Sequence, residues 1–386
     1  LVAEAIQEIA DTLVTVGAAQ STHCRQTAAA AAKAGLRCAL VLSGRPPPRP
    51  WNGNLLLHAL LGAELHWAGD EDRSRAAAAV VARLQAEGAR PFFFRVGGSV
   101  PTGAAGYVAA AEELPRLREA LGGGPRLWIK RDDQTGLATG GNKARKLEFL
   151  VAEGLEQGAD TLVTVGAAQS NHCRQTAAAA AKVGLKCALV LSGHPPPRPW
   201  SGNLLLHALL GAELHWAGDE DRSRAAAEVV ARLQAAGARP FFFRVGGSVP
   251  TGAAGYVAAV EELFEQLQER HLELDRIVFA SGSAGTQAGI LAGVQALGLN
   301  ARVEGISVEA VGDLLGEIKE LTPATIARLG LDLKIADEAY IVHDAYGKPG
   351  YAVITEAERA AIGLLARTEG ILVDPVYTGR ALAGML

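Results

Sequence analysis

A lysine that follows two glycines and an asparagine is the first candidate for chemistry in this sequence. Residues 140–143 read Gly-Gly-Asn-Lys and come after the charged stretch Lys-Arg-Asp-Asp at 130–133. Glycines allow a close approach between backbone and ligand. Arg145 and Lys146 follow Lys143, and such a positive field lowers the pKa of an amine, as a Schiff-base lysine requires. The alternative is an exposed charge beside a turn.

A glycine-rich turn supplies the second candidate. Residues 278–289, Val-Phe-Ala-Ser-Gly-Ser-Ala-Gly-Thr-Gln-Ala-Gly, place an apolar run before a Gly/Ser/Thr turn and a helix. Backbone N–H groups and hydroxyls at a helix N-terminus form a cradle for an anion or phosphate. No Gly-Lys-Ser/Thr follows, as a Walker loop requires, and Ser281 stands where a nucleophile elbow centred on Ser283 needs glycine. A tight turn without a ligand is the alternative.

A third motif, Gln-Ser-Asn-His at 169–172, follows an apolar run and opens a helix. Ser170 or Asn171 would suit the N-cap of that helix. The same N–H groups would equally suit a substrate carboxylate, so both interpretations stay open.

A fourth motif, Asp-Pro-Val-Tyr-Thr-Gly at 374–379, follows the apolar run 370–373. If that run is a strand, Tyr377 and Thr378 face the cleft at strand ends, where ligands bind in α/β proteins. The alternative is a tyrosine buried in a turn.

The elements that position these motifs alternate between short apolar runs and Ala/Leu-rich helices. The runs are continuous, as in parallel sheets buried on both faces, and predict an α/β fold with doubly wound sheets. The expected strands are 127–131, 161–165, 187–191, 213–216, 240–243, 276–280 and 302–307. The expected helices are 142–156, 171–183, 202–211, 220–236, 252–269, 286–297 and 354–368.

Residues 1–114 recur as residues 150–263, with 13 differences and 101 identities in the 114 aligned positions. Two domain-sized copies are not a solenoid, which repeats every ~20–50 residues. Lys143 and the turn at 282–286 occur once, so a site that needs both forms once. The first copy has Thr22 where the second has Asn171, and it has no counterpart of Lys143. We expect the first copy to be catalytically silent and a hazard for domain swapping.

Composition narrows the class of protein. Hydrophobic residues make up 49% and charged residues 20%, which is typical of a folded protein with large cores. The net charge of −4 does not suggest a nucleic-acid partner, and no apolar run is long enough for a membrane span. The four cysteines lack metal-ligand spacing, so we expect buried thiols in a reducing compartment, the cytoplasm, and no metal.

In combination, the four motifs resemble the 1-aminocyclopropane-1-carboxylate deaminase/D-cysteine desulfhydrase family of pyridoxal-phosphate enzymes. The resemblance runs from about residue 115 to residue 386. It implies the tryptophan-synthase-β-like fold, with two doubly wound parallel-sheet domains preceded by a duplicate of the smaller one. It assigns 119–149 and 264–386 to a large cofactor-binding domain, 150–263 to a small domain and 1–118 to a non-catalytic copy.

The resemblance also implies roles for residues. Lys143 would bind the cofactor, pyridoxal 5′-phosphate, covalently and move protons, and Asn171 would bond its phenolic oxygen. The cofactor phosphate and the substrate carboxylate would each be held by a cluster of neighbouring residues. The phosphate would be held by Ser283, Ala284, Gly285 and Thr286, and the carboxylate by Ser170, Asn171 and His172. Tyr377, with Tyr351, would lie over the substrate side chain.

Thr378 favours one activity within the family. Members that open the cyclopropane ring carry Glu after the tyrosine, whereas Thr is similar to the D-cysteine desulfhydrase pattern. We therefore expect β-elimination from D-cysteine to pyruvate, hydrogen sulfide and ammonia, by a homodimer acting on a small amino acid. The alternatives are 1-aminocyclopropane-1-carboxylate deaminase and an inactive relative. The second is an alternative because the family's last strand would follow Leu386 and is not in this sequence, and because the end of the first copy replaces the family's usual lead-in before residue 115. A third class, a nucleotide-binding oxidoreductase, would need a dinucleotide fingerprint and an acidic partner for the ribose, and the sequence shows neither clearly.

Overall fold

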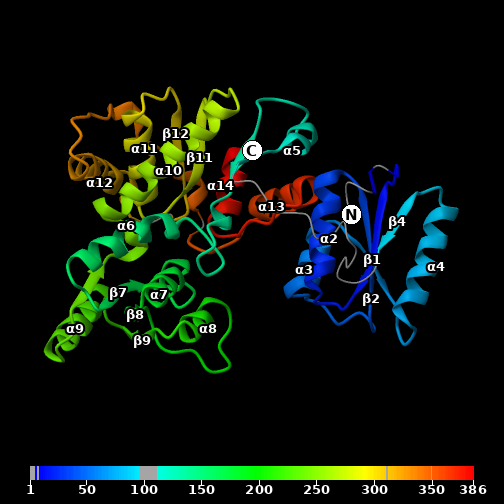
Figure 1. Ribbon diagram of the computed structural model, residues 1–386, viewed down its shortest axis with the longest axis horizontal. Helices are drawn as coiled ribbons and strands as arrows, with labels where there is room; N and C mark the ends of the chain where they lie inside the picture. The colour runs from blue at the N-terminus through cyan, green and yellow to red at the C-terminus, as the bar shows by residue number, and fades with distance from the viewer. Residues whose placement is uncertain (1–4, 7, 95–110, 310–311, 349) are drawn as a thin grey trace. The chain divides into compact units, whose positions relative to one another are not determined.

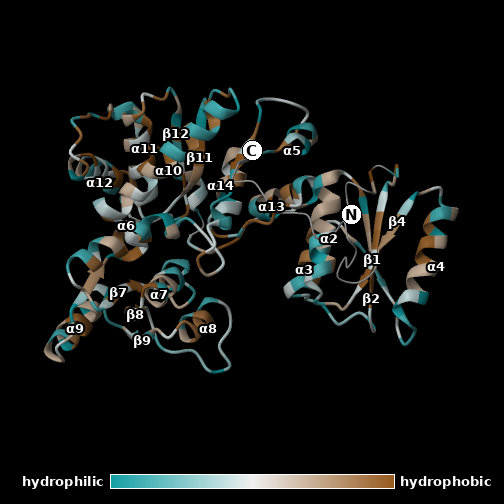
Figure 2. Ribbon diagram, in the orientation of Figure 1, coloured by the Kyte–Doolittle hydropathy of each residue, from teal (hydrophilic) through white to brown (hydrophobic). Residues whose placement is uncertain are grey.

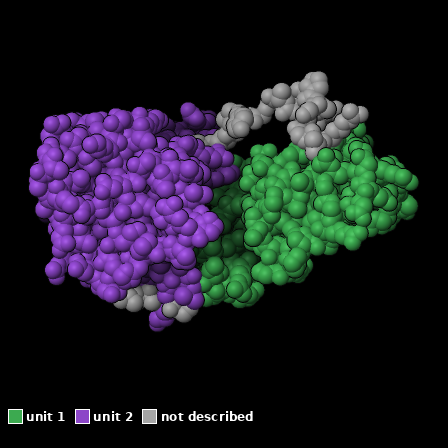
Figure 3. All heavy atoms as spheres, turned by 90° about the horizontal axis from the view of Figure 1, so that it is seen from below, with its two compact units in different colours: residues 1–130, 354–384, 386 green, residues 131–353, 385 purple. Residues whose placement is uncertain are grey.

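The computed structural model describes residues 5–6, 8–94, 111–309, 312–348 and 350–386. Contacts divide the chain into two compact units (Figure 3). Unit 1 comprises residues 1–130, 354–384 and 386, and unit 2 comprises 131–353 and 385. This partition follows contacts, and the domain boundaries expected from the repeat and the resemblance stay a prediction.

The first copy forms a parallel four-stranded sheet in unit 1, in the order β3-β2-β1-β4. Helices α2 and α3 cover one face and α4 covers the other (Figure 1). The strands are apolar (Figure 2), and every residue of β1 is buried. The strands are β1 (Thr12–Gly17), β2 (Arg37–Leu42), β3 (Glu64–Trp67) and β4 (Pro91–Phe94). The helices are α2 (Thr22–Ala34), α3 (Gly53–Leu60) and α4 (Arg73–Ala86).

The second copy repeats this sheet in unit 2, in the order β10-β7-β8-β9. All of its predicted strands are confirmed to within one residue. The strands are β7 (Thr161–Gly166), β8 (Lys186–Leu191), β9 (Glu213–Trp216) and β10 (Pro240–Phe243). The helices are α6 (Lys143–Glu156), α7 (Asn171–Val183), α8 (Gly202–Leu209) and α9 (Arg222–Ala235).

A second parallel sheet of unit 2, in the order β11-β12-β13, carries the glycine-rich turn. Its strands are β11 (Arg276–Ser281), β12 (Arg302–Ser307) and β13 (Ile341–His343). The associated helices are α10 (Pro250–Glu269), α11 (Gly285–Ala296) and α12 (Leu314–Arg328). α12 is not among the predicted helices; it contains Pro323 in its interior, where proline normally ends or kinks a helix.

The rest of unit 1 corrects two expectations. β6 (Trp128–Lys130) was expected in a parallel sheet, but it pairs antiparallel with β5 (Ala111–Glu113). The two strands are connected through α5 (Pro115–Ala120), and an apolar run does not by itself specify in which direction its neighbour runs. The apolar run 370–373 is not a strand; it links α13 (Glu356–Glu369) to α14 (Thr378–Met385).

Within the part of the chain that the structure describes, no helix has both the length and the apolar character that a bilayer span requires.

Candidate functional site

Lys143 is the first residue of α6, and the loop before it is tightly constrained. Gly140 and Gly141 have φ values of 71° and 127°, in the region that favours glycine. A Cβ added at Gly140 would lie 1.9 Å from the carbonyl oxygen of Asp133. The N–H of Gly141 donates to the carbonyl of Asp132 (2.9 Å) and to Oγ1 of Thr135 (3.1 Å). The two glycines are therefore a geometric requirement of this loop.

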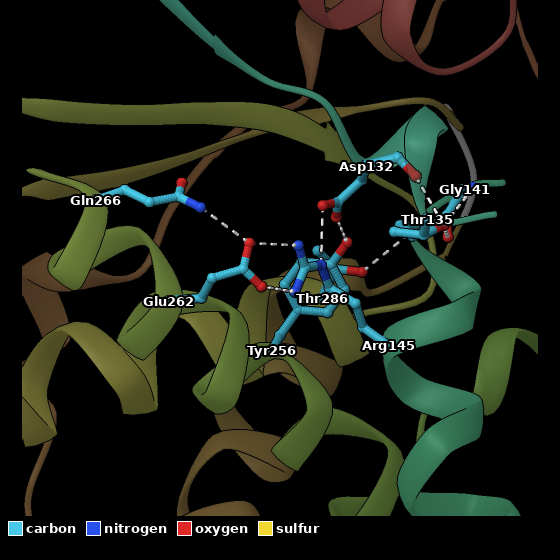
Figure 4. Close-up of polar contacts among 9 residues, drawn as sticks. Asp132, Thr135, Gly141, Arg145, Tyr256, Glu262, Gln266 and Thr286 are labelled. Atoms are coloured by element: carbon cyan, nitrogen blue, oxygen red, sulfur yellow. Dashed lines mark hydrogen bonds and ion pairs between the residues drawn. The ribbon is translucent and has the colours of Figure 1, made fainter. Parts of the chain in front are cut away.

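Arg145 anchors the same loop from the first turn of α6 (Figure 4). Its Nε donates to Oδ1 of Asp132 and its Nη1 to Oε2 of Glu262, each at 2.8 Å. The hydroxyl of Tyr256 donates to the other oxygen of Asp132 (2.5 Å). Arg145 is thus balanced by two carboxylates, so it does not supply the positive field expected around Lys143.

Lys146, next to the lysine loop, is a buried lysine without an acidic partner among the described residues. It lies one turn after Lys143, is 1% exposed, and its Nζ donates to the carbonyl of Gly246 (3.2 Å). Desolvation lowers the pKa of Lys146 well below its usual 10.5, and the charge of Lys143 lowers it further. No carboxylate forms an ion pair with Lys146 among the described residues.

The glycine-rich turn meets Lys146 at the start of α11. A Cβ at Gly285 would lie 2.8 Å from Nζ of Lys146 and 2.9 Å from Oγ of Ser248. Ser248 in turn donates to Oγ of Ser283 (3.0 Å). Ala284, the N-cap of α11, has φ 58°, which costs a non-glycine residue about 1–3 kcal/mol. Strain of this kind is typical of a turn shaped for a ligand.

Asn142 joins the lysine loop directly to this turn. Its Nδ2 donates to Oγ1 of Thr286 (3.3 Å), and its Oδ1 accepts from Nζ of Lys143 (3.2 Å). The structure therefore brings Lys143 together with Thr286 and the predicted phosphate turn, although they are far apart in the sequence.

Ser170 and Asn171 form the start of α7. Ser170 is the N-cap, and its Oγ accepts from the N–H of Cys173 (3.2 Å), so the capping interpretation is confirmed. This bond uses a lone pair of the hydroxyl and not its hydrogen. Asn171 is exposed, and its Oδ1 accepts from Arg174 (2.7 Å) and Asn203 (2.8 Å). Donor groups of both residues therefore stay compatible with the predicted ligand contacts.

His172 is placed differently from a surface ligand. It is 4% exposed, its Nε2 lies 2.9 Å from Oγ1 of Thr164, and its ring meets the edge of Phe243. Burial lowers the pKa of His172 well below 6.5, and the charges of Lys143 and Lys146 lower it further. Within the described chain, no partner reaches its Nδ1. A neutral, buried imidazole offers no positive charge to a carboxylate, and the predicted contact of His172 with the substrate stays a prediction.

The remaining predicted residues lie elsewhere. Tyr351 is an exposed residue of unit 2. Tyr377 and Thr378 belong to unit 1, in a turn organised by Asp374, whose carboxylate accepts from the N–H groups of Val376, Tyr377 and Thr378. The hydroxyl of Thr378 also donates to it (2.6 Å). The site built here from unit 2 does not include these two residues.

Three residues of this site were missed from the sequence: Ser248, Arg174 and the structural role of Lys146. Lys146 could have been found, because residues three apart share one face of a helix. Ser248 follows two glycines before a helix, which is a signal similar to the turn at 282–286. Arg174 had no local signal.

These residues fit a phosphate-bearing cofactor. The start of α11 presents N–H groups that lack partners within the helix, and its dipole favours an anion. The hydroxyls of Ser248 and Ser283 and the buried ammonium of Lys146 lie beside it. A phosphate would balance Lys146, and Gly285 leaves space that a side chain would fill.

Known proteins are similar to this chain in both sequence and fold. A D-cysteine desulfhydrase of Klebsiella pneumoniae is 44% identical over 281 residues, which cover 71% of this chain and 84% of that protein. One of Serratia proteamaculans is 43% identical over 287 residues, covering 73% and 86%. The crystal structure of an ACC deaminase homologue, 36% identical, has a TM-score of 0.66 and covers 72% of this chain and 84% of that chain.

This structural likeness confirms the expected fold class, α/β with parallel sheets of the tryptophan-synthase-β-like fold. The model of the family described as "Pyridoxal-phosphate dependent enzyme" matches residues 1–119 and 111–386. The chain therefore belongs to the pyridoxal-phosphate dependent enzymes, among the relatives of D-cysteine desulfhydrase and ACC deaminase.

Proposed function

We propose that this protein is a pyridoxal-phosphate-dependent lyase that converts D-cysteine to pyruvate, hydrogen sulfide and ammonia. The observation that carries the proposal is the meeting of Lys143, Thr286 and the buried Lys146 in a chain 43–45% identical to D-cysteine desulfhydrases. The Thr378 that follows Tyr377 supports D-cysteine over the cyclopropane substrate.

The phosphate of the cofactor would be held at the start of α11. Its ligands would be the turn residues Ser283, Ala284, Gly285 and Thr286, together with Lys146. Lys143 would hold the cofactor covalently through its amine, and the Nδ2 of Asn171 would donate to the phenolic oxygen. When bound, pyridoxal phosphate supplies an electron sink that stabilises negative charge at the substrate α-carbon.

Residues of this chain would bind the substrate and move its protons. The hydroxyl of Ser170 and the N–H groups at the start of α7 would hold the carboxylate. Lys143 Nζ, freed when the substrate amine takes its place on the cofactor, would take the α-proton, and the carbon–sulfur bond would break with its electron pair leaving as hydrosulfide. Hydrolysis of the resulting aminoacrylate by one water gives pyruvate and ammonia. Tyr351 would contact the side chain of the substrate, and only the family resemblance assigns the same role to Tyr377 and Thr378.

ACC deaminase is the second candidate, favoured by the likeness to the ACC deaminase homologue. We also infer that the first copy is silent, because Thr22 replaces Asn171 and no lysine matches Lys143. The buried free cysteines of the described chain support a reducing compartment, the cytoplasm. A homodimer that takes a small amino acid, with no nucleic-acid partner, completes the proposal.

A substrate panel tests the activity. The protein loaded with pyridoxal phosphate is incubated with D-cysteine, L-cysteine or 1-aminocyclopropane-1-carboxylate, and sulfide, pyruvate and ammonia are measured. Equal amounts of the three products from D-cysteine support the proposal. Ammonia from the cyclopropane substrate, without turnover of D-cysteine, selects the second candidate. No product from any substrate contradicts both.

A further inference from the structure

Arg174 connects the lysine loop to the start of α7, and the function above does not account for it. Its side chain is 7% exposed. Nη2 donates to the carbonyl of Gly140 (2.9 Å), three residues before Lys143. Nη1 donates to Oδ1 of Asn171 (2.7 Å) and to Oδ1 of Asn203 (2.8 Å). One guanidinium therefore joins the lysine loop to Asn171, the first residue of α7, and Gly140 and Asn171 belong to parts of the proposed site with separate roles.

The contacts of Arg174 fix which way the amide of Asn171 faces. Arginine has donors and no acceptor, so the Asn171 atom that faces it must be the oxygen. Asn203 imposes the same choice. Its Nδ2 donates to the carbonyl of Gln169 (2.7 Å), so this atom of Asn203 must be the nitrogen. The same Nδ2 also donates to the side chain of Asn171 (2.8 Å), so the atom of Asn171 that accepts must be Oδ1. With its oxygen held by two donors, Asn171 must direct its NH₂ group to other partners.

The same helix also lies close to the other glycine of the loop. A Cβ at Gly141 would lie 2.7 Å from Nε2 of Gln175, which is fully buried. Arg174 therefore bonds to Gly140, and Gln175 leaves room at position 141 only for a glycine. Movement of this part of α7 would shift the position of the lysine amine.

The first copy shows the same arginine without this task. Arg25 corresponds to Arg174, but its Nη1 reaches Asn54 at 3.4 Å, and Thr22 offers no amide to orient. The lysine loop has no counterpart there. Arg25 is half-buried, whereas Arg174 is buried. The tight bonds of Arg174 thus depend on the loop and on Asn171, the features that distinguish the second copy.

We propose that Arg174 is a positioning residue of the reaction: it holds Gly140, and so Lys143, in register with α7 and directs the amide NH₂ of Asn171 toward the cofactor. This rests on the proposed function of the site. A planar guanidinium with several donors suits the task, because a lysine would act as a single point and could not hold both Gly140 and Asn171 in a fixed geometry.

The test uses Arg174→Ala and Arg174→Lys, with Arg25→Ala as the matched control in the first copy. Steady-state kinetics with D-cysteine, thermal unfolding and hydrogen exchange of peptides covering 135–147 are measured for the holoenzyme. We expect kcat to fall about 100-fold in Arg174→Ala, the size of effect caused by small misplacements of reacting groups, with a smaller change in KM. Exchange in 135–147 should rise, added guanidinium should restore kcat in part, and Arg25→Ala should match the unmodified protein.

Two results would overturn the proposal. The first is exchange in 135–147 that is equal in Arg174→Ala and Arg25→Ala. The second is a folded Arg174→Lys with unchanged kcat, because the fork geometry would then be dispensable. If the unmodified protein turns over no substrate, the proposed function fails, and the exchange comparison still decides whether Arg174 holds the loop.

Discussion

Replacing Glu358 by glutamine tests how α13 and α14 are held together within unit 1. The carboxylate of Glu358 accepts from Nε of Arg380 (2.7 Å) and from the N–H of Thr355 (2.7 Å), and both charged side chains are buried. Arg380 lies two residues after Thr378, so this pair fixes the base of the turn that carries the predicted substrate residues.

The magnitude follows from the pKa. Burial alone would raise the pKa of Glu358, but the hydrogen bonds of Thr355 and Arg380 outweigh it and bring the pKa to about 2, against 4.5 ordinarily. That difference corresponds to about 3 kcal/mol of stability. Because the folded pKa is the lower one, this contribution is complete above pH 4.5 and is lost as the pH falls toward 2. Removing one partner of a buried ion pair typically costs about 3–5 kcal/mol, which agrees with the value of about 3 kcal/mol obtained from the pKa.

The assay is hydrogen exchange of the α13 peptide in increasing urea, which gives the free energy of opening for the part that holds the pair. Glu358→Gln should lose about 3 kcal/mol at pH 7 and should show a weaker dependence on pH below 4.5. Glu356→Gln is the control, because Glu356 is exposed and forms a surface ion pair with exposed Arg359, so its loss should be about 0–1 kcal/mol. Equal losses in the two variants would refute the reasoning.

Three further predictions concern the lysine loop and the turn. Gly285→Ala should lower the affinity for pyridoxal phosphate in a fluorescence titration, because the new Cβ would lie 2.8 Å from Nζ of Lys146; unchanged affinity would contradict the phosphate site. Lys146→Met should make the cofactor-free protein more stable at pH 7 while it weakens cofactor binding. The pKa of Lys146 is lower in the folded protein than in the unfolded chain. The stability of the unmodified protein should therefore rise with pH up to about 10.5, and this rise should disappear in Lys146→Met. Tyr256→Phe should cost about 1 kcal/mol in urea unfolding, through the lost bond to Asp132; no loss would show that Arg145 alone holds Asp132.

Local patterns predicted most of the elements. The runs at β7 to β12 were found because continuous apolar stretches bounded by glycines identify buried parallel strands, and α6 begins within one residue of its expected start. β13 was missed because three residues are too few to form a pattern. β6 and the run 370–373 were misjudged because an apolar run does not by itself specify the direction of its pairing, or whether it pairs at all: β6 pairs antiparallel with the neighbouring β5.

The parts of the candidate site that lie within a single sequence motif were predictable. The Lys143 loop and the turn at Ser283 were identified from glycines next to polar residues. Contacts between segments far apart in sequence were not, such as the bond from Arg174 to Gly140. The burial of His172 was also missed, since its adjacent motif residues, Ser170 and Asn171, carry the polar signal of a surface turn.

The central claim is that Lys143 binds pyridoxal phosphate in a working site, and the visible absorption spectrum tests it most directly. The unmodified protein, Lys143→Ala and the control Lys182→Ala, an exposed lysine of α7, are each mixed with pyridoxal phosphate and then with D-cysteine. The account predicts a cofactor band that shifts with D-cysteine in the unmodified protein and in Lys182→Ala and that is missing from Lys143→Ala. A band that persists in folded Lys143→Ala, or no band in the unmodified protein, would contradict it.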